Sequence, residues 1–222
     1  MASSPPSKLT RLQEDLLREF FSREQRFFLT GGAALSGFYL GHRETEDLDL
    51  FSPPGVDLED ASRVLQEAAG AAGATLEPVR RFAEFQRWLA RRGGETCVVD
   101  LVVDRAPQVD TQKAVRGTLR LDTLREIAAN KLSALIGRSE AKDLVDLQAL
   151  LGRQQIRLED AIRDASLKDR GVDPATLAWV LDSIRIGSEA ALPGDVDPKA
   201  LDDFRRDLVA RLRGMAFAQT RS

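Results

Sequence analysis

Two aspartates separated by one residue are the clearest candidates for chemistry in this sequence. Asp47 and Asp49 lie in the segment 46–51, whose alternation of acidic and apolar residues predicts a strand. Side chains two positions apart on a strand share one face, with Cα atoms about 7 Å apart. Carboxylates this close repel each other unless a positive charge lies between them, and a hard divalent cation is the usual solution. The pair predicts a metal site, and the alternative is two solvated acids on an edge strand.

Asp100 is the candidate for a third metal ligand. It lies in the centre of the apolar segment 97–103, where an unpaired carboxylate would lose much of its solvation energy. If this segment is a strand next to the first one, three carboxylates form a site for two Mg²⁺ ions. Such a site can activate a hydroxyl nucleophile and stabilise a leaving pyrophosphate. Asp104 lies on the same side by period two but near the strand end, and we interpret it as an edge or loop acid.

Gly31 and Gly32 follow an apolar strand at 27–30 and precede a short helix at 33–40. Backbone amides at the start of a helix bind phosphate, and glycine lets the phosphate approach closely. The sequence lacks the lysine and the spacing of a Walker A loop, so the glycines could also form only a turn. Arg43 could contact a phosphate or simply flank the loop, and we interpret His42 as a loop anchor.

Lys131 is the most informative residue of the C-terminal half. On a helical wheel it falls in the middle of an apolar face, formed by Leu124, Ile127, Ala128 and Leu135. It is either a snorkelling lysine at a domain edge or a lysine directed at a triphosphate. Asp143 and Asp146 share a face of the next helix, either as ordinary helix acids or as part of the site.

The predicted elements divide the chain near residue 118. Residues 1–118 form an α/β domain, and residues 119–222 form a helical domain. Helices are expected at 8–25, 33–40 and from 57 to about 70, and strands at 27–30, 46–51, 76–81, 85–91 and 96–103. The segment 85–91 also fits a helical period, but the turn at 93–94 favours a hairpin. After a loop at 104–117, helices are expected at 123–137, 140–151, 174–186 and 198–213.

The composition is that of a soluble protein. The 222 residues carry a formal net charge of -3, so contact with nucleic acid would need a local patch. The basic segment 80–92, in which three aromatic residues are interleaved with the arginines, is either such a patch or a solvated face. The single Cys97 excludes an internal disulfide, and no stretch is long and apolar enough to cross a membrane. We therefore expect a cytoplasmic protein without a membrane partner.

Taken in order, these motifs resemble the AbiEii/AbiGii group of polymerase-β-like nucleotidyltransferases, which includes toxins of abortive-infection and toxin–antitoxin systems. The resemblance runs from about residue 27 to residue 151, and residues 152–222 carry no recognised motif. It rests on Gly31-Gly32, Gly41-His42-Arg43, Asp47-Leu48-Asp49-Leu50-Phe51, Asp100 within a strand, Asn130-Lys131-Leu132-Ser133-Ala134-Leu135 and Lys142-Asp143-Leu144-Val145-Asp146-Leu147.

The resemblance implies an α+β fold, in which a polymerase-β-like nucleotidyltransferase domain with a mixed sheet and flanking helices precedes an all-helical C-terminal domain that completes the active-site cleft. It implies that Asp47 and Asp49 hold metal, that Lys131 contacts nucleotide phosphates, and that Asp143 acts as a base or positions the acceptor. Two features depart from the pattern: many relatives have Gly-Ser at Gly31-Gly32, and an arginine often precedes the aspartate where this chain has Lys142.

The expected activity is transfer of a nucleoside monophosphate from a nucleoside triphosphate (NTP) to an acceptor hydroxyl. The expected cofactor is Mg²⁺ or Mn²⁺, and NTP phosphates would bind at Gly31, Gly32, Arg43 and Lys131. The acceptor could be a tRNA 3′ end or another RNA, and a toxin could have a DNA-binding antitoxin as its partner. The alternative is a non-catalytic descendant that binds a nucleotide or a partner protein.

Overall fold

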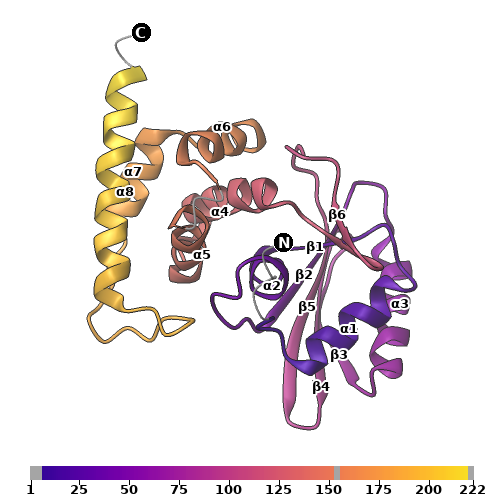
Figure 1. The fold of residues 1–222 in the computed structure, drawn as a ribbon. Coiled ribbons are helices and arrows are strands. Elements are labelled where there is room, and N and C mark those ends of the chain that lie inside the picture. The colour runs from indigo at the N-terminus through magenta and orange to yellow at the C-terminus, as the bar shows by residue number, and fades with distance from the viewer. Residues whose placement is uncertain (1–6, 153–155, 220–222) are drawn as a thin grey trace. The chain divides into compact units, whose positions relative to one another are not determined.

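The structure, a computed structural model, describes residues 7–152 and 156–219 (Figure 1). The chain separates into two units that each make most of their contacts internally. The first contains Met1–Arg105 and Thr111–Thr123, and the second contains Ala106–Asp110 and Leu124–Ser222.

A mixed sheet forms the first unit. Its seven strands lie in the order β3-β4-β5-β2-β1-β7-β6. They are β1 (Phe28–Thr30), β2 (Asp47–Ser52), β3 (Thr75–Arg81), β4 (Phe85–Arg92), β5 (Glu95–Val103), β6 (Ala114–Arg116) and β7 (Leu119–Leu121). The pairs β2–β5 and β1–β7 are parallel, and the other neighbours are antiparallel. The expected α+β fold with a mixed sheet is confirmed, as is the hairpin formed by β4 and β5.

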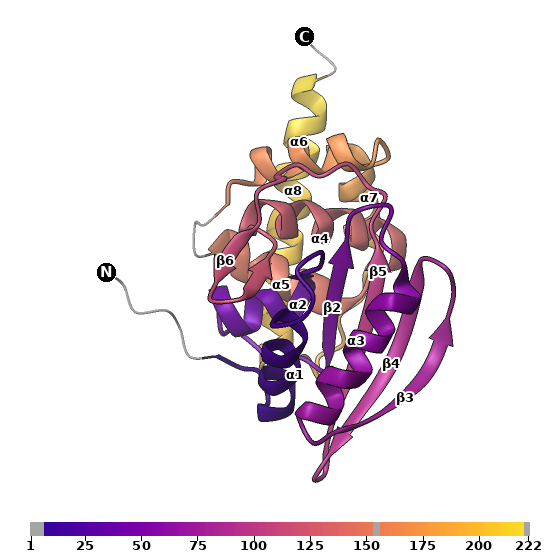
Figure 2. The ribbon, with the colours of Figure 1, turned by 90° about the vertical axis from the view of Figure 1, so that its right-hand side faces the viewer.

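Two helices, α1 (Arg11–Phe21) and α3 (Leu58–Ala71), cover one face of this sheet (Figure 2). β2 alternates between half-buried and buried residues, and its buried Leu48 and Leu50 belong to the covered face. Polar contacts join the same face to the helices: Gln86 donates to the Glu59 carboxylate at 2.9 Å. The acids of β2 and β5 are therefore on the opposite face, because successive side chains of a strand alternate.

The segment after β1 begins as the short helix α2 (Gly31–Ala34) and continues as a π-helical turn, η1 (Leu35–Tyr39). It ends at Gly41, whose φ of 56° is the left-handed conformation that commonly terminates helices. This segment replaces the regular helix expected at 33–40. π-helical turns are rare and are frequent near functional sites.

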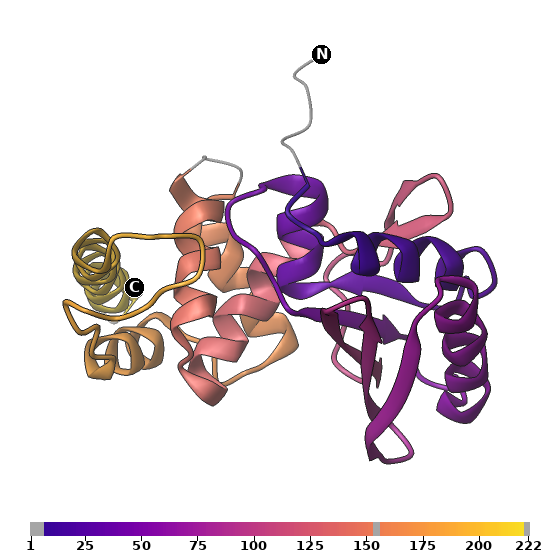
Figure 3. The ribbon, with the colours of Figure 1, turned by 90° about the horizontal axis from the view of Figure 1, so that it is seen from below.

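The regular structure described in the second unit is helical. The helices are α4 (Leu124–Arg138), α5 (Ala141–Gly152), α6 (Leu158–Lys168), α7 (Pro174–Ser183) and α8 (Pro198–Gln219). α7 and α8 pack side by side, as seen along the axis of α8 in Figure 3. Asp173 caps α7 by accepting from the amides of Ala175 and Thr176 at 2.8 and 2.9 Å. Within the described part of the chain, no helix is both long enough and apolar enough to cross a lipid bilayer.

Two strands were not predicted from the sequence. β6 lies within the loop expected at 104–117, β7 lies in the stretch assigned to the helical domain before its first expected helix at 123, and each has only three residues. A strand this short has no measurable period, and it forms here because Leu121 pairs with Leu29 of β1. The division between the units consequently falls at residues 123 and 124, beyond β7, whereas the sequence placed it at 118 and 119. α6 had no predicted bounds, and α8 extends beyond the predicted end at 213.

Glu126 of α4 attaches the segment 106–110 to the helices of the second unit. Its fully buried carboxylate accepts from the amides of Val109 and Asp110 at 2.9 and 2.8 Å and pairs with Lys168 of α6. Removing one partner of a buried ion pair leaves a buried charge without compensation.

We expect Glu126→Ala to lower the free energy of unfolding by about 3 kcal/mol, because Lys168 and two amides would lose their acceptor. Chemical denaturation followed by circular dichroism measures this change. Lys199→Ala, which removes the exposed partner of Asp203 in α8, is the control and should have little effect. Equal losses in the two variants would contradict the role of Glu126.

Candidate active site

Strand register brings five polar side chains into one row across the sheet. The direct partners are Thr30 of β1, Asp49 of β2, Asp100 of β5, Arg87 of β4 and Arg80 of β3. We call these five residues the polar row. Directly paired side chains have Cβ atoms about 4.5–5.5 Å apart, so neighbours in the row can interact. Asp47 lies on the same face, two residues before Asp49 and opposite Val98.

The glycine turn lies directly against one of the acids. Gly31 has a φ of 66°, and a Cβ added to it would overlap the Oδ2 atom of Asp49. The Asp49 carboxylate therefore lies over the Gly31 Cα, in a space that only glycine leaves open. The two motifs, separated by 17 residues in the sequence, form one local arrangement through the β1–β2 pairing.

Gly32 makes a similar space for a cation. A Cβ on Gly32 would overlap the Nη2 atom of Arg43, whose side chain is buried and donates from Nη1 to the Glu44 carbonyl at 2.9 Å. The guanidinium of Arg43 therefore lies over the second glycine of the turn. The adjacent His42 is half-buried in the same loop.

Asp100 pairs with an arginine that was not predicted to belong to the site. Arg87 donates from Nε and Nη2 to the two Asp100 carboxylate oxygens at 2.8 and 2.7 Å. This two-fold contact raises the pKa of the Arg87 guanidinium well above its usual value, and the charges of Asp47 and Asp49 contribute in the same direction. Asp100 is buried, whereas the Arg87 side chain is 43% exposed.

The three predicted metal ligands therefore share a face without forming a closed ligand cluster. Among the described residues, no group of three or more His, Cys, Asp or Glu side chains is arranged to hold a metal ion. The physical reason lies at Asp100, whose two oxygens point to Arg87. Each carboxylate oxygen that accepts one hydrogen bond still has a second lone pair.

The second unit contains a separate buried cluster around Lys131. Its Nζ atom lies 2.8 Å from Asp143 Oδ1 and 2.6 Å from Asp146 Oδ2, and Arg138 contacts both oxygens of Asp143 at 2.8 and 2.9 Å. Both carboxylates are fully buried, and only about 7% of the Lys131 side chain is exposed. The structure thus brings together the predicted residues Lys131 and Asp143, adds Asp146, and adds Arg138, which was not predicted.

Opposing effects determine the pKa values of this cluster. Burial alone would lower the pKa of Lys131, but the carboxylates of Asp146 and Asp143 outweigh it and raise the pKa above its usual value. Burial would raise the pKa of Asp143, but Arg138 and Lys131 outweigh it and lower the pKa. At neutral pH the lysine is therefore charged and the Asp143 carboxylate is ionised.

The sheet of the first unit carries another buried ion pair, which lies beside β1. Lys113 Nζ is 2.6 Å from Asp122 Oδ1 and 4.0 Å from the centre of the Phe28 ring. Tyr39 donates to the Asp122 carbonyl at 2.8 Å. Neither charged residue was a sequence candidate, because Lys113 falls in a predicted loop with no local pattern.

Other sequence candidates have structural explanations. Burial raises the pKa of Cys97 to about 12, so its thiol is a poor nucleophile at neutral pH. In the basic segment 80–92, Arg81 and Arg92 pair with Glu59 and Asp15 of the covering helices. These two arginines therefore belong to the packing of the sheet on its helices, whereas Phe82 of the same segment is exposed.

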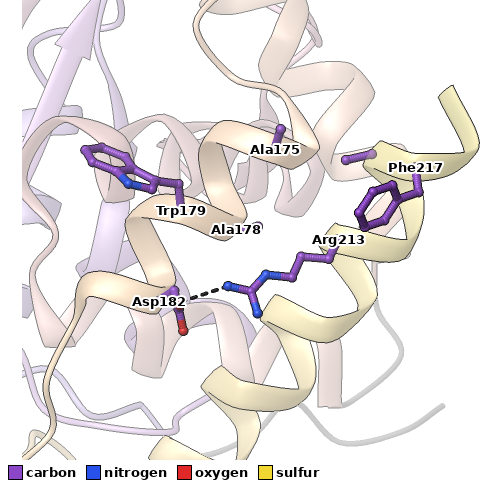
Figure 4. Close-up of a pocket in the computed structure, with 7 residues that line it drawn as sticks. Ala175, Ala178, Trp179, Asp182, Arg213 and Phe217 are labelled. Atoms are coloured by element: carbon purple, nitrogen blue, oxygen red, sulfur yellow. Dashed lines mark hydrogen bonds and ion pairs between the residues drawn. The ribbon is translucent and has the colours of Figure 1, made fainter. Parts of the chain in front are cut away.

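A hollow lies between α7 and α8 (Figure 4). Its lining is Ala175, Ala178, Trp179, Asp182, Arg213, Ala216 and Phe217. The charged groups of this lining are already paired, since Arg213 Nη2 lies 2.8 Å from Asp182 Oδ2. Among the seven lining residues, Asp182 and Arg213 are the charged ones and they pair with each other. The hollow is therefore not the candidate active site.

Two solved structures share the fold of this chain, a mixed sheet with flanking helices followed by further helices. JHP933 from Helicobacter pylori aligns with a TM-score of 0.59 and 17% identity over 95% of this chain and 94% of that protein. An H. pylori protein proposed to be a nucleotidyltransferase aligns with a TM-score of 0.59 and 18% identity over 92% of this chain and 95% of that protein. At these identities the likeness establishes the fold alone.

The sequence establishes the family. Residues 15–220 match the family described as the nucleotidyl transferase AbiEii toxin of type IV toxin–antitoxin systems, and the chain belongs to this AbiEii family. The match extends through α6, α7 and α8, whose residues carry no recognised motif. No curated protein matches the chain.

The contact between Gly31 and Asp49 predicts that even alanine is harmful at position 31. Gly31→Ala combines a left-handed φ with an overlap at the Asp49 carboxylate, so we expect a loss of about 1–3 kcal/mol in the free energy of unfolding. Chemical denaturation measures it. Gly70→Ala is the matched control: Gly70 lies within α3 with open space around it, so alanine there should stabilise by about 0.5–1 kcal/mol.

The Lys131 cluster predicts a stability change that depends on pH. Asp143→Ala leaves Arg138 and Lys131 with one carboxylate fewer, so we expect a loss of about 3–5 kcal/mol near pH 7. The lowered pKa of Asp143 contributes stability above its unfolded-state pKa, and this contribution is lost as pH falls through the lower folded-state value. The difference between wild type and variant should therefore shrink below about pH 4.

Denaturation curves from pH 3 to pH 7 test this prediction. Asp203→Ala, which removes the partner of the exposed Lys199, is the control and should change stability little at any pH. A difference for Asp143→Ala that stays constant across the range would show that packing, not ionisation, causes the loss.

Proposed function

We propose that this protein is a divalent-metal-dependent nucleotidyltransferase that transfers a nucleoside monophosphate from an NTP to an acceptor hydroxyl. In this reaction the acceptor oxygen bonds to the α-phosphorus, and the bond from that phosphorus to the oxygen bridging to the β-phosphate breaks. Pyrophosphate leaves, and the hydroxyl proton passes to a base or to water. Membership of the AbiEii family supports the reaction class. The observation that carries the proposal is the position of the Asp49 carboxylate against Gly31 on the sheet face that also holds Asp47.

The donor chemistry of this face fits Mg²⁺ or Mn²⁺. Asp47 and Asp49 provide hard oxygen ligands from one strand, and Asp100 is the direct partner of Asp49 on the next. We propose that Asp47 and Asp49 hold the metal and that Asp100 contributes an oxygen lone pair while it remains paired with Arg87. A bound divalent ion would favour the ionised acceptor oxygen and neutralise charge on the phosphates.

Cations and backbone amides would hold the triphosphate. We propose that Gly31 and Gly32 allow the phosphates to approach the backbone, and that Arg43 contributes its charge over the same turn. Lys131 is proposed to contact the nucleotide phosphates as well. Its ammonium group has three N–H donors, of which Asp143 and Asp146 use two.

Of the two roles considered for Asp143, positioning has the better support. A general base works best when its pKa is near the operating pH, whereas Arg138 and Lys131 lower the pKa of Asp143. An ionised Asp143 keeps Lys131 charged and fixes its direction. We therefore propose that Asp143 positions Lys131 and does not take the proton from the acceptor hydroxyl.

The family description supports a biological role as the toxin of a type IV toxin–antitoxin system. On this basis we propose that the acceptor is an RNA hydroxyl, with a tRNA 3′ end as the first candidate. We also propose that the toxin functions with a DNA-binding antitoxin. The surface arginines of the polar row, Arg87 and Arg80, are compatible with a polyanionic acceptor.

Transfer assays test the proposal. The protein is incubated with each α-labelled NTP, Mg²⁺ or Mn²⁺, and total RNA, and transfer of label to RNA is measured. We expect transfer that EDTA abolishes and that Asp47→Ala reduces at least about 100-fold, because one of the two carboxylates proposed to hold the metal is lost. Glu46→Ala removes an exposed carboxylate one residue earlier and is the matched control.

Lys131→Ala is assayed after its folding has been checked, because the change leaves two buried carboxylates without their lysine. Transfer by folded Lys131→Ala at the wild-type rate would contradict the role of this lysine. Nucleotide binding without transfer to any acceptor would favour the alternative function, a non-catalytic nucleotide-binding protein.

A further inference from the structure

The hydroxyl of Thr30 has no internal partner in the described residues. Thr30 is only 3% exposed, and its Oγ1 atom is buried without a hydrogen bond. A buried hydroxyl without a partner destabilises a protein by about 1–3 kcal/mol. Valine has almost the same shape and would remove this cost, and it also favours strands. The packing of β1 therefore gives no reason for a hydroxyl at this position.

The usual local explanation for threonine at this position does not apply. Thr30 is the residue immediately before α2, where a threonine hydroxyl normally accepts a hydrogen bond from an amide of the first helical turn. Its backbone is extended, with φ of -128° and ψ of -167°, but its side chain makes no capping hydrogen bond. Thr10 shows the contrast within the same chain, because its hydroxyl accepts from the Gln13 amide at 3.2 Å at the start of α1.

The position of Thr30 points to a ligand. It is the first residue of the polar row and the direct partner of Asp49, so the two side chains share a face. It also directly precedes Gly31, whose missing Cβ makes room for the Asp49 carboxylate. A phosphate held beside Asp49 and the glycine turn would be adjacent to this hydroxyl.

We propose that Thr30 is a nucleotide-binding residue whose hydroxyl donates a hydrogen bond to a phosphate oxygen of the bound NTP. The inference rests on the proposed function, because the ligand is the nucleotide of that reaction. The Thr30 hydroxyl, which has no partner in the free protein, would gain one when the nucleotide binds. The chain thereby tolerates a destabilising group in the free state, as binding sites often do.

Paired substitutions separate this role from a structural one. Thr30→Val removes the hydroxyl and keeps the shape, whereas Thr30→Ser keeps the hydroxyl. Ser36→Ala is the control, because Ser36 has the other buried serine or threonine hydroxyl without a partner in the described residues, and it lies in η1, outside the polar row. Two quantities are measured for each full-length variant: the midpoint of thermal unfolding without ligand, and the Kd of each NTP with Mg²⁺ by calorimetry. Inorganic tripolyphosphate with Mg²⁺ is measured in parallel.

We expect Thr30→Val to keep or raise the unfolding midpoint and to weaken binding of both the NTP and tripolyphosphate about tenfold or more, as for loss of a hydrogen bond to a charged group. Thr30→Ser should bind within about threefold of wild type, since it keeps the donor. Ser36→Ala should keep or raise the midpoint and leave both Kd values unchanged.

Three results would overturn the inference. Wild-type affinity in Thr30→Val would show that the hydroxyl does not reach the ligand. A lower unfolding midpoint in Thr30→Val but not in Thr30→Ser would show that the hydroxyl has a structural partner. Weaker binding of the NTP with unchanged binding of tripolyphosphate would place the contact on the nucleoside. If wild-type protein binds no NTP at all, the proposed function itself fails, which is a different outcome from equal binding by wild type and Thr30→Val.

Discussion

The register between β2 and its two neighbours is the constraint on which the candidate site depends. Leu48 and Leu50 are buried on the covered face, beside Val99 and Leu101 of β5. A shift of one residue would expose these leucines and move Asp49 into the apolar core. The hydrophobic effect on one face therefore fixes the positions of the carboxylates on the other, and no interaction among the acids is needed to align them.

Buried charge in this protein is consistently arranged around specific partners. Asp100 has Arg87, Asp122 has Lys113, and Asp143 and Asp146 share Lys131. Such pairs contribute little net stability, because desolvation offsets most of the attraction. Their stronger effect is to fix the direction of the charged groups, since a misplaced member would be a buried charge without compensation. In both units, ion pairing thus orients the side chains that the proposed chemistry requires.

The sequence predicted most of the elements that carry the site. The strands around Asp47, Asp49 and Asp100 have clear alternation, and a two-glycine turn marks the hairpin of β4 and β5. β6 and β7 could not be predicted, because three-residue strands depend on a partner rather than on a period. The helical wheel of α4 placed Lys131 on an apolar face, but it could not distinguish a surface lysine from one paired with two acids of α5.

The sequence by itself determined the residue types, their order and their faces: a glycine turn, two acids on one side of a strand, a third acid in an apolar strand, and the motifs of the AbiEii family. Tertiary structure decided the partners. It placed Asp49 against Gly31, Arg87 on Asp100, and Thr30 at the end of the same row without a hydrogen bond. The physical reason is that faces follow from local backbone periodicity, whereas partners follow from cross-strand register, which only the packing of distant segments establishes.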